Sequence, residues 1–151
     1  MKVSDVMSKK VLSASPDDTL GSVIGKLSGR NITGMPVVHQ GKVVGIITQT
    51  DILRNMDLFS GVNDFSDMVS IKKMMKGKDV SGDRVKKLHS RKVKHFMNKK
   101  VITIGDNNAL SDAVKMINEN DIDRLPVVHG KKLIGILTKK DVMKAVAKMN
   151  A

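Results

Sequence analysis

The feature that most constrains this chain is an internal repeat with an offset of 90 residues. Sliding the 151-residue sequence by that offset aligns residues 3–57 with residues 93–147 without a gap, and 16 of the 55 aligned pairs are identical. Most other pairs in the buried-looking segments exchange one apolar residue for another. The chain is therefore a tandem duplication. We expect residues 1–57 and 93–151 to form two similar domains, with residues 58–92 as a linker between them.

Both copies contain the same order of predicted elements. A short strand, KKVLS in the first copy and KKVIT in the second, leads into a turn rich in helix N-cap residues. A helix follows, because apolar residues recur at the spacing i, i+3, i+4 and i+7. Two strands and a final helix complete the copy. The strands VVGIIT and LIGILT are apolar throughout, which is typical of strands buried on both faces.

The resulting unit is β-α-β-β-α, and the predicted fold class is α/β (α+β). A single unit of roughly 55 residues buries too little surface to be comfortably stable alone. We therefore expect two units packed sheet to sheet with pseudo-twofold symmetry, so that the clefts between them occur in pairs.

The composition indicates a globular, soluble protein, with 40% hydrophobic and 28% charged residues. No run approaches the roughly 18 apolar residues of a membrane span, and the segment MKVSDVMSKK lacks the apolar stretch of a signal peptide. The absence of cysteine excludes disulfides, thiolate metal sites and cysteine nucleophiles. We expect a cytoplasmic protein without a membrane partner.

The formal net charge of +12 favours an anionic partner. The excess is +2 in residues 1–57, +5 in residues 58–92 and +5 in residues 93–151, so the linker, which we expect to be a basic helical insert, is the most densely charged part. Nucleic acid, nucleotides or an acidic protein would fit, as would a lysine-rich surface facing solvent. With three Phe and no Trp or Tyr, few side chains are available to stack on single-stranded nucleic acid.

Two octapeptides, GIITQTDI (45–52) and GILTKKDV (135–142), each place a Thr and an Asp three residues apart where a predicted strand gives way to a helix. This spacing is close to a capping box, in which each side chain caps the backbone N–H of the other residue. A carboxylate at such a corner can also accept hydrogen bonds from both hydroxyls of a ribose, each contributing roughly 1.5–3 kcal/mol. The residues alone leave both interpretations open.

Together these motifs resemble the CBS domain, named after cystathionine β-synthase. The resemblance rests on PVV, a short hairpin, the GIIT or GILT strand and the Asp three residues after its Thr, in the same order in each copy. A tandem pair of this kind resembles a Bateman module. The resemblance implies a homodimer and a regulatory sensor of adenosyl compounds, such as AMP, ADP, ATP, S-adenosylmethionine or methylthioadenosine. No other cofactor is implied, and the regulated partner would be a separate protein.

The resemblance also implies a set of ligand-binding residues. Asp51 and Asp141 would hold a ribose, with Thr48 and Thr138 beside them, and Arg124 would pair with a phosphate. The other members come from the two strands that contain proline and from the segment that leads into the first strand of the opposite copy: Met35, Pro36, Val37, Leu125, Pro126, Val127, Lys10, Val11, Lys100 and Val101.

The strand DRLPVV carries a second expectation. Proline donates no hydrogen bond and is found at strand edges. We expect the backbone groups of Leu125 and Val127 to be free to contact an adenine edge.

The two clefts are not expected to be equivalent, because Gly34 stands in the first copy where the second copy has Arg124. We expect Arg124 and Asp141, faced by residues 9–11, to form the cleft that binds a phosphorylated ligand. The cleft with Gly34, faced by residues 99–101, would be empty or would take a ligand without phosphate at that place.

No catalytic or metal-binding motif is evident in the sequence. His39 and His129 occupy equivalent positions in the predicted hairpin turns, and the other two histidines have no ligand spacing. A P-loop and a nucleophile elbow are both missing, so we expect a protein that is not an enzyme. Two alternatives to the sensor remain: a basic nucleic-acid-binding protein on the same scaffold, and a structural dimerisation module with degenerate sites.

Overall fold

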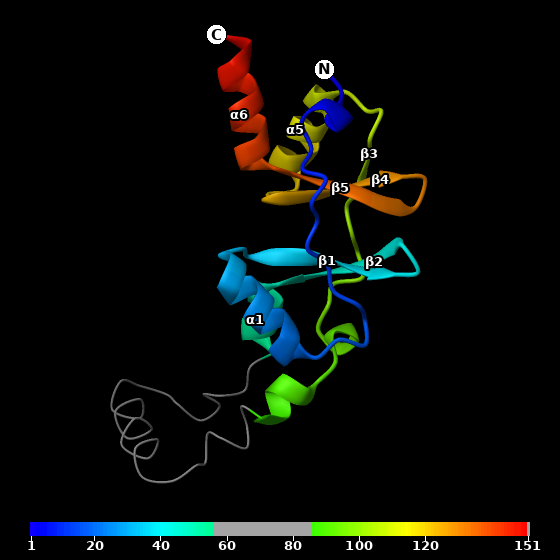
Figure 1. The fold of residues 1–151 in the computed structure, drawn as a ribbon, viewed down its shortest axis with the longest axis vertical. Coiled ribbons are helices and arrows are strands. Elements are labelled where there is room, and N and C mark those ends of the chain that lie inside the picture. Colours follow the sequence, from blue (N-terminus) through cyan, green and yellow to red (C-terminus); the bar gives the residue numbers. More distant parts are fainter. Residues whose placement is uncertain (56–85, 151) are drawn as a thin grey trace, which may run out of the picture.

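The computed structural model describes residues 1–55 and 86–150. In this part of the chain the two copies form two stacked halves, each with helices on the outside and strands toward the other half (Figure 1). The mixed α+β class expected from the repeat is confirmed. The linker 58–92 is described only from residue 86 onward, so most of the expected helical insert lies outside the described residues.

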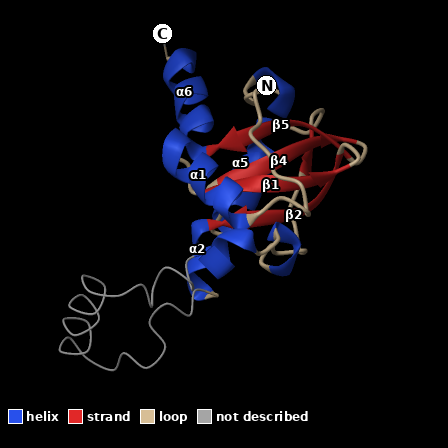
Figure 2. Cartoon of the chain, turned by 60° about the horizontal axis from the view of Figure 1, so that its bottom comes forward, coloured by secondary structure: helices blue, strands red, loops and turns tan. Residues whose placement is uncertain are grey.

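The elements follow the same order in both copies, and Figure 2 distinguishes helices from strands. The first copy contains the 3-10 helix η1 (Val3–Asp5), α1 (Leu20–Arg30), β1 (Gly34–His39), β2 (Lys42–Thr48) and α2 (Gln49–Arg54). The second contains η3 (Val93–His95), β3 (Ile104–Gly105), α5 (Leu110–Glu119), β4 (Arg124–His129), β5 (Lys132–Thr138) and α6 (Lys139–Met149). Among these helices none has both the length and the apolar character required to cross a membrane.

The first strand of each copy is shorter and begins later than KKVLS and KKVIT predict. In the second copy it is β3, which runs parallel to β4. In the first copy it is reduced to a single parallel bridge between Ala14 and Val37. Residues 9–13 and 99–103 form no ladder because they carry the chain from one half of the molecule to the other (Figure 1).

The two hairpins have the same register. β1 pairs antiparallel with β2, beginning with Gly34 opposite Thr48, and β4 pairs with β5, beginning with Arg124 opposite Thr138. Both hairpins have a register shift between the two valines of PVV. One pair, between the first residues of β2 and β5, joins them into a five-stranded sheet of order β1-β2-β5-β4-β3. The hairpins therefore repeat one another at the 90-residue offset, as pseudo-twofold symmetry requires.

Each half has its own hydrophobic core between its strands and helices. In the first half, α1 buries Leu20, Val23 and Leu27, as the helical spacing predicts. They pack with the fully buried Met35 and Ile47 of β1 and β2. The equivalent core of the second half contains buried residues of α5, β4 and β5: Leu110, Ala113, Ile117, Leu125, Val127 and Leu137.

The two copies exchange their leading segments. We call residues 1–8 the N-terminal arm and residues 91–98 the second arm. Val3 of the N-terminal arm is fully buried in the core of the second half, while Val93 of the second arm is fully buried in the core of the first half. Backbone hydrogen bonds secure the N-terminal arm, since Ser8 and Ile136 exchange two, each of 2.9 Å. Each core is therefore completed by the other copy.

Glycine makes the close contact between arm and strand possible. A Cβ atom on Gly135 of β5 would lie 2.5 Å from Sδ of Met7 and 3.1 Å from the carbonyl oxygen of Ser8. A Cβ atom on Gly45 of β2 would lie 2.6 Å from Sδ of Met97. A side chain at either position would displace the methionine thioether and press on the backbone of the arm, because the arms lie directly on the strands.

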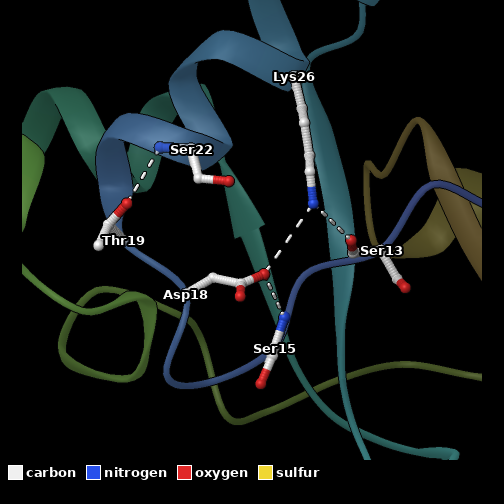
Figure 3. Close-up of polar contacts among 6 residues, drawn as sticks. All are labelled: Ser13, Ser15, Asp18, Thr19, Ser22 and Lys26. Carbon is white, nitrogen blue, oxygen red and sulfur yellow. Dashed lines mark hydrogen bonds and ion pairs between the residues drawn. The ribbon is translucent and has the colours of Figure 1, made fainter.

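The turn before α1 is held by its own side chains. Oδ2 of Asp18 accepts the backbone N–H of Ser15 at 2.8 Å, and Oγ1 of Thr19 accepts the backbone N–H of Ser22 at 3.3 Å (Figure 3). The ammonium group of Lys26 donates to the carbonyl oxygen of Ser13 at 3.4 Å (Figure 3). The turn is thus fixed where the second arm passes it.

Asp17, in this turn, forms ion pairs with two lysines of the second arm. Its Oδ1 lies 3.2 Å from Nζ of Lys94 and 3.4 Å from Nζ of Lys92. The hydrogen bond and the charge of Lys94, followed by those of Lys92, hold the pKa of Asp17 below its ordinary value. Because these groups are exposed to solvent, they position the arm more than they stabilise it.

Candidate functional site

A pocket of about 560 Å³ lies between the two halves, beside the corner where β2 passes into α2. This volume is within the roughly 300–1,000 Å³ of most small-molecule sites. Its walls come from the first residues of β1, the β2–α2 corner, the connecting segment 98–102 and the loop between α5 and β4. The lining residues are Thr33, Gly34, Ile46, Thr48, Gln49, Thr50, Asp51, Asn98, Lys100, Val101, Ile102, Asn120, Asp121, Ile122, Asp123 and Arg124. Both copies are needed to form this pocket.

Reciprocal hydrogen bonds close the corner between β2 and α2. Oδ2 of Asp51 accepts the backbone N–H of Thr48 at 3.0 Å and the hydroxyl of Thr48 at 2.8 Å. The backbone N–H of Asp51 donates to Oγ1 of Thr48 at 3.2 Å. The capping box is therefore present. Within residues 1–55 and 86–150, no hydrogen bond goes to Oδ1 of Asp51, so the cap uses only one of the two carboxylate oxygens.

The same box recurs between β5 and α6. Oδ2 of Asp141 accepts the backbone N–H of Thr138 at 2.9 Å and its hydroxyl at 2.8 Å, and the backbone N–H of Asp141 donates back at 3.1 Å. The capping interpretation is thus confirmed at both corners. The ribose interpretation stays a prediction, and the caps are compatible with it because each leaves one oxygen unused by the cap.

Arg124 lies in the wall of the pocket that contains Asp51. We had expected it at the cleft around Asp141, and its backbone does pair with Thr138 across β4 and β5. The start of β4, however, also lies at the boundary between the two halves. Arg124 therefore lines the same pocket as Asp51. Nε of Arg124 is buried and has no hydrogen-bond partner among the described residues. Such a donor is costly unless a ligand or water accepts from it.

The segments that follow the arms lie where the resemblance places them, beside strands of the opposite copy. Asn98 forms a bridge with Ile46 of β2, and Lys100 and Val101 then line the pocket with Asp51. On the other side Ser8 forms a bridge with Ile136 of β5. The chain continues there into Lys10, which is exposed, and Val11, which is half-buried. Contact of Lys10 and Val11 with a ligand stays a prediction.

The strand residues around the two prolines belong to the cores rather than to the pocket wall. Hardly any of their side-chain surface is exposed, and this holds for Met35, Pro36, Val37, Leu125, Pro126 and Val127. None of these side chains lines the pocket.

The orientation of these backbones corrects one expectation. The carbonyl of Pro36 accepts the backbone N–H of Ala14 at 3.0 Å, and the N–H of Val38 donates to the carbonyl of Ala14 at 2.8 Å. Backbone groups alternate between the two sides of a strand, so the residues next to Pro36 turn theirs toward β2. Because β4 has the same register, the backbone groups of Leu125 and Val127 point toward β5 and are not free for an adenine edge.

Several polar residues of the pocket were not anticipated from the sequence. Asn120, Asp121 and Asp123 come from the loop before β4, and Gln49 and Thr50 from the first turn of α2. Gln49, Thr50 and Asp123 lie within the segments GIITQTDI and DRLPVV, but the sequence assigned them no role there. The loop could have been predicted from its position directly before Arg124, because it must lie close to wherever Arg124 lies.

Neither the histidines nor the acids of the described residues suggest a metal centre, since no group of three or more lies close enough to bind an ion. His129 ends β4, and its Nδ1 lies 3.1 Å from Oδ1 of Asp106. His39 ends β1 at the equivalent turn.

A model of the CBS domain matches residues 3–58 and 93–148 of this chain. The chain belongs to the CBS domain family. The two matched segments coincide with the two copies of the repeat, so the protein contains a tandem pair of CBS domains.

Relatives with this pair occur both as proteins of similar length and as parts of longer chains. The protein MJ1426 of Methanocaldococcus jannaschii is 33% identical over 97% of this chain and 91% of its own length. The CBS domain-containing protein DDB_G0289609 of Dictyostelium discoideum is 29% identical over 97% of this chain and 92% of its own length. This chain spans only 32%, 40% and 23% of three further relatives from M. jannaschii, the last of which is an inosine-5'-monophosphate dehydrogenase.

Solved CBS structures share the fold over the whole chain. CBSX2 of Arabidopsis thaliana in complex with AMP superposes with a TM-score of 0.74 at 24% identity, covering 99% of this chain and 98% of that one. The CBS domain pair of MJ0100, in complex with 5'-methylthioadenosine and S-adenosyl-L-methionine, gives a TM-score of 0.68 at 21% identity over 99% and 98% of the two chains.

Proposed function

We propose that this protein is a regulatory sensor, not an enzyme, and that it binds an adenosyl compound in the pocket of Asp51. One observation carries the proposal: the pocket contains both Asp51, whose Oδ1 is unused by the helix cap, and Arg124, whose buried Nε lacks a partner in the described residues. The lining of one cavity thus includes a carboxylate that can accept from hydroxyl groups and an arginine whose guanidinium group can donate to an anion. The AMP and S-adenosylmethionine complexes of related pairs support the choice of ligand class.

Each part of the ligand has a counterpart in the pocket. Oδ1 of Asp51 accepts the ribose hydroxyls, and Arg124, assisted by Lys100, binds the anionic group. The adenine lies against aliphatic side chains such as Ile46 and Val101, since no aromatic residue is among the described residues that line the pocket. The equivalent cleft around Asp141, with Thr138, Lys10 and Val11, is proposed as a second adenosyl site. We place the better anion site at Asp51, because Arg124 lines that pocket.

Asp51→Asn tests the ribose contact with little disturbance of the cap, because the amide oxygen of Asn can still accept from Thr48. We expect the affinity for AMP or S-adenosylmethionine to fall roughly 10- to 100-fold, the effect of losing charge-assisted hydrogen bonds. Isothermal titration calorimetry measures the affinity, and thermal melting measures the stability of each variant. Asp5→Asn is the matched control, since Asp5 caps η1 by accepting the N–H of Lys2 at 2.8 Å and lies outside the pocket.

Two results would contradict the proposal. Unchanged affinity in Asp51→Asn, with only a lower melting temperature, would mean that the carboxylate is a cap alone. Wild-type protein that gives neither heat nor a melting shift with AMP, ADP, ATP, S-adenosylmethionine or methylthioadenosine would remove the adenosyl role altogether.

Regulation requires that the ligand bind one arrangement of the halves, or of an assembly, better than another. We propose that the protein acts as a homodimer on a separate partner protein. Leu53 of α2 and Met143 of α6 are equivalent in the repeat, and 66% of each side chain is exposed. A second copy related by a twofold axis would cover both residues at once.

The double variant Leu53→Lys, Met143→Lys is expected to sediment as a monomer in analytical ultracentrifugation while keeping its circular dichroism spectrum. Lys115→Ala changes an exposed position on α5, where the ammonium group pairs with Glu119 of the same helix, and should sediment like the wild type. A monomeric wild type at micromolar concentration would contradict the homodimer.

A further inference from the structure

The loop between α5 and β4 brings two carboxylates to the wall of the Asp51 pocket. Asp121 and Asp123 both line it, directly before Arg124. Asp121 has a φ of 49°, a left-handed conformation that Asp and Asn adopt more readily than other side chains. Oδ1 of Asp123 lies 3.2 Å from Nζ of Lys139 at the start of α6. The loop therefore holds both acids next to the group that we assign to the ligand's anion.

These acids give the pocket a charge balance unlike that of the protein. Its lining includes three carboxylates, of Asp51, Asp121 and Asp123, against two cations, Lys100 and Arg124, for a formal charge of −1. Lys139, which contacts Asp123, brings the balance only to zero. The chain as a whole carries +12. A pocket that is neutral or negative in so basic a protein is poorly suited to a ligand with several negative charges.

The repeat provides an internal comparison. The positions equivalent to Asp121 and Asp123 are Asn31 and Thr33, which are uncharged. Asn31 has the same left-handed conformation, with a φ of 50°. The turn geometry therefore does not require a carboxylate at the first position.

We propose that Asp121 and Asp123 are specificity-determining residues that limit the Asp51 pocket to adenosyl compounds with a single anionic group. This selectivity rests on the proposed function, adenosyl binding at Asp51. One anionic group pairs with Arg124, whereas the further phosphates of a di- or triphosphate would come close to the carboxylates of Asp121 and Asp123. A nucleoside monophosphate and the carboxylate of an aminoacyl sulfonium compound share this chemistry. The sulfonium compound also carries positive charge, which the acids favour.

The test compares AMP, S-adenosylmethionine, ADP and ATP by calorimetry, with and without Mg²⁺, in the wild type and in Asp121→Asn, Asp123→Thr, which copies the residues of the first repeat. An Asp141→Asn background weakens binding at the other cleft. We expect the wild type to bind AMP at least about tenfold more tightly than ATP, and the double variant to lose most of this preference through stronger ATP binding. Both effects should shrink as salt is raised, because the acids are exposed to solvent.

Comparing the affinities for AMP and S-adenosylmethionine shows whether the anionic group that binds is a phosphate or a carboxylate. Asp112→Asn, in the first turn of α5 and outside the pocket, is the control and should keep the wild-type ratio of AMP to ATP affinity. If the double variant is unstable, Asp121→Asn alone retains the left-handed turn and should shift the ratio in the same direction.

Two outcomes overturn the proposal. Equal affinity of the wild type for AMP and ATP would refute the proposed selectivity for a single anionic group, and so would an unchanged ratio of AMP to ATP affinity in the double variant. Either result would leave adenosyl binding intact. A wild type that binds none of the four compounds would refute both the proposed function and the proposed selectivity.

Discussion

Val3→Asp is expected to destabilise the second half of the protein and to spare the first, although residue 3 belongs to the first copy in sequence. Val3 is fully buried in the core formed by α5, β4 and β5. An unpaired carboxylate there has no cationic partner, and we expect a loss of at least about 3 kcal/mol in the free energy of unfolding of that half. Hydrogen exchange followed by mass spectrometry should show faster exchange in residues 104–138 than in residues 14–48.

The mirror variant Val93→Asp supplies the control. Val93 is equally buried in the core of the first half, so the faster exchange should move to residues 14–48. The opposite pattern, in which each substitution loosens its own copy, would contradict the exchange of arms.

Gly135→Val is expected to lower the free energy of unfolding by roughly 1–3 kcal/mol, the usual cost of forcing extra atoms into a packed site. Even the first added carbon would lie 2.5 Å from Sδ of Met7 and 3.1 Å from the carbonyl oxygen of Ser8. The N-terminal arm would have to move away from β5. Urea denaturation measures the change in the free energy of unfolding, provided that this free energy depends on urea concentration with the same slope in the variant and the wild type.

Shortening the opposing side chain tests the cause of this loss. Met7→Ala together with Gly135→Ala should be more stable than the sum of the two single effects predicts, because each change makes room for the other. Gly130→Ala is a comparison with a different mechanism: an added Cβ atom meets nothing within 4 Å there, but the φ of 65° is unfavourable. Additive effects of Met7→Ala and Gly135→Ala would mean that the glycine is required for another reason.

Local sequence patterns predicted the elements of each copy well. The helical spacing at Leu20, Val23 and Leu27 describes the buried face of α1, because that spacing reflects a single helix packing on a single sheet. The prediction of strands at KKVLS and KKVIT was wrong, because these residues cross between the halves and have no neighbouring strand to pair with. The family resemblance placed the segments after the arms, but periodicity could not show that Val3 and Val93 fill opposite cores.

The candidate site likewise contains residues that the sequence predicted and residues that it did not. Thr48 and Asp51 were predictable because a capping box depends on four consecutive residues. Arg124 was expected beside Asp141, and it lies opposite Thr138 but also lines the pocket of Asp51, since the pocket that a boundary residue lines depends on how the two halves are packed. Asp121 and Asp123 were missed for the same reason, and the repeat gave no hint because their equivalents are uncharged.

The crossed arms bear on how such a chain could have arisen. A primordial protein with one copy would have lacked the valine that completes its own interior, because that residue reaches only into a neighbouring copy. Two such molecules could have completed each other's cores by trading arms, as the two copies do here. Gene fusion would then have joined two chains that already depended on each other. In this history the reciprocal partnership is older than the single polypeptide.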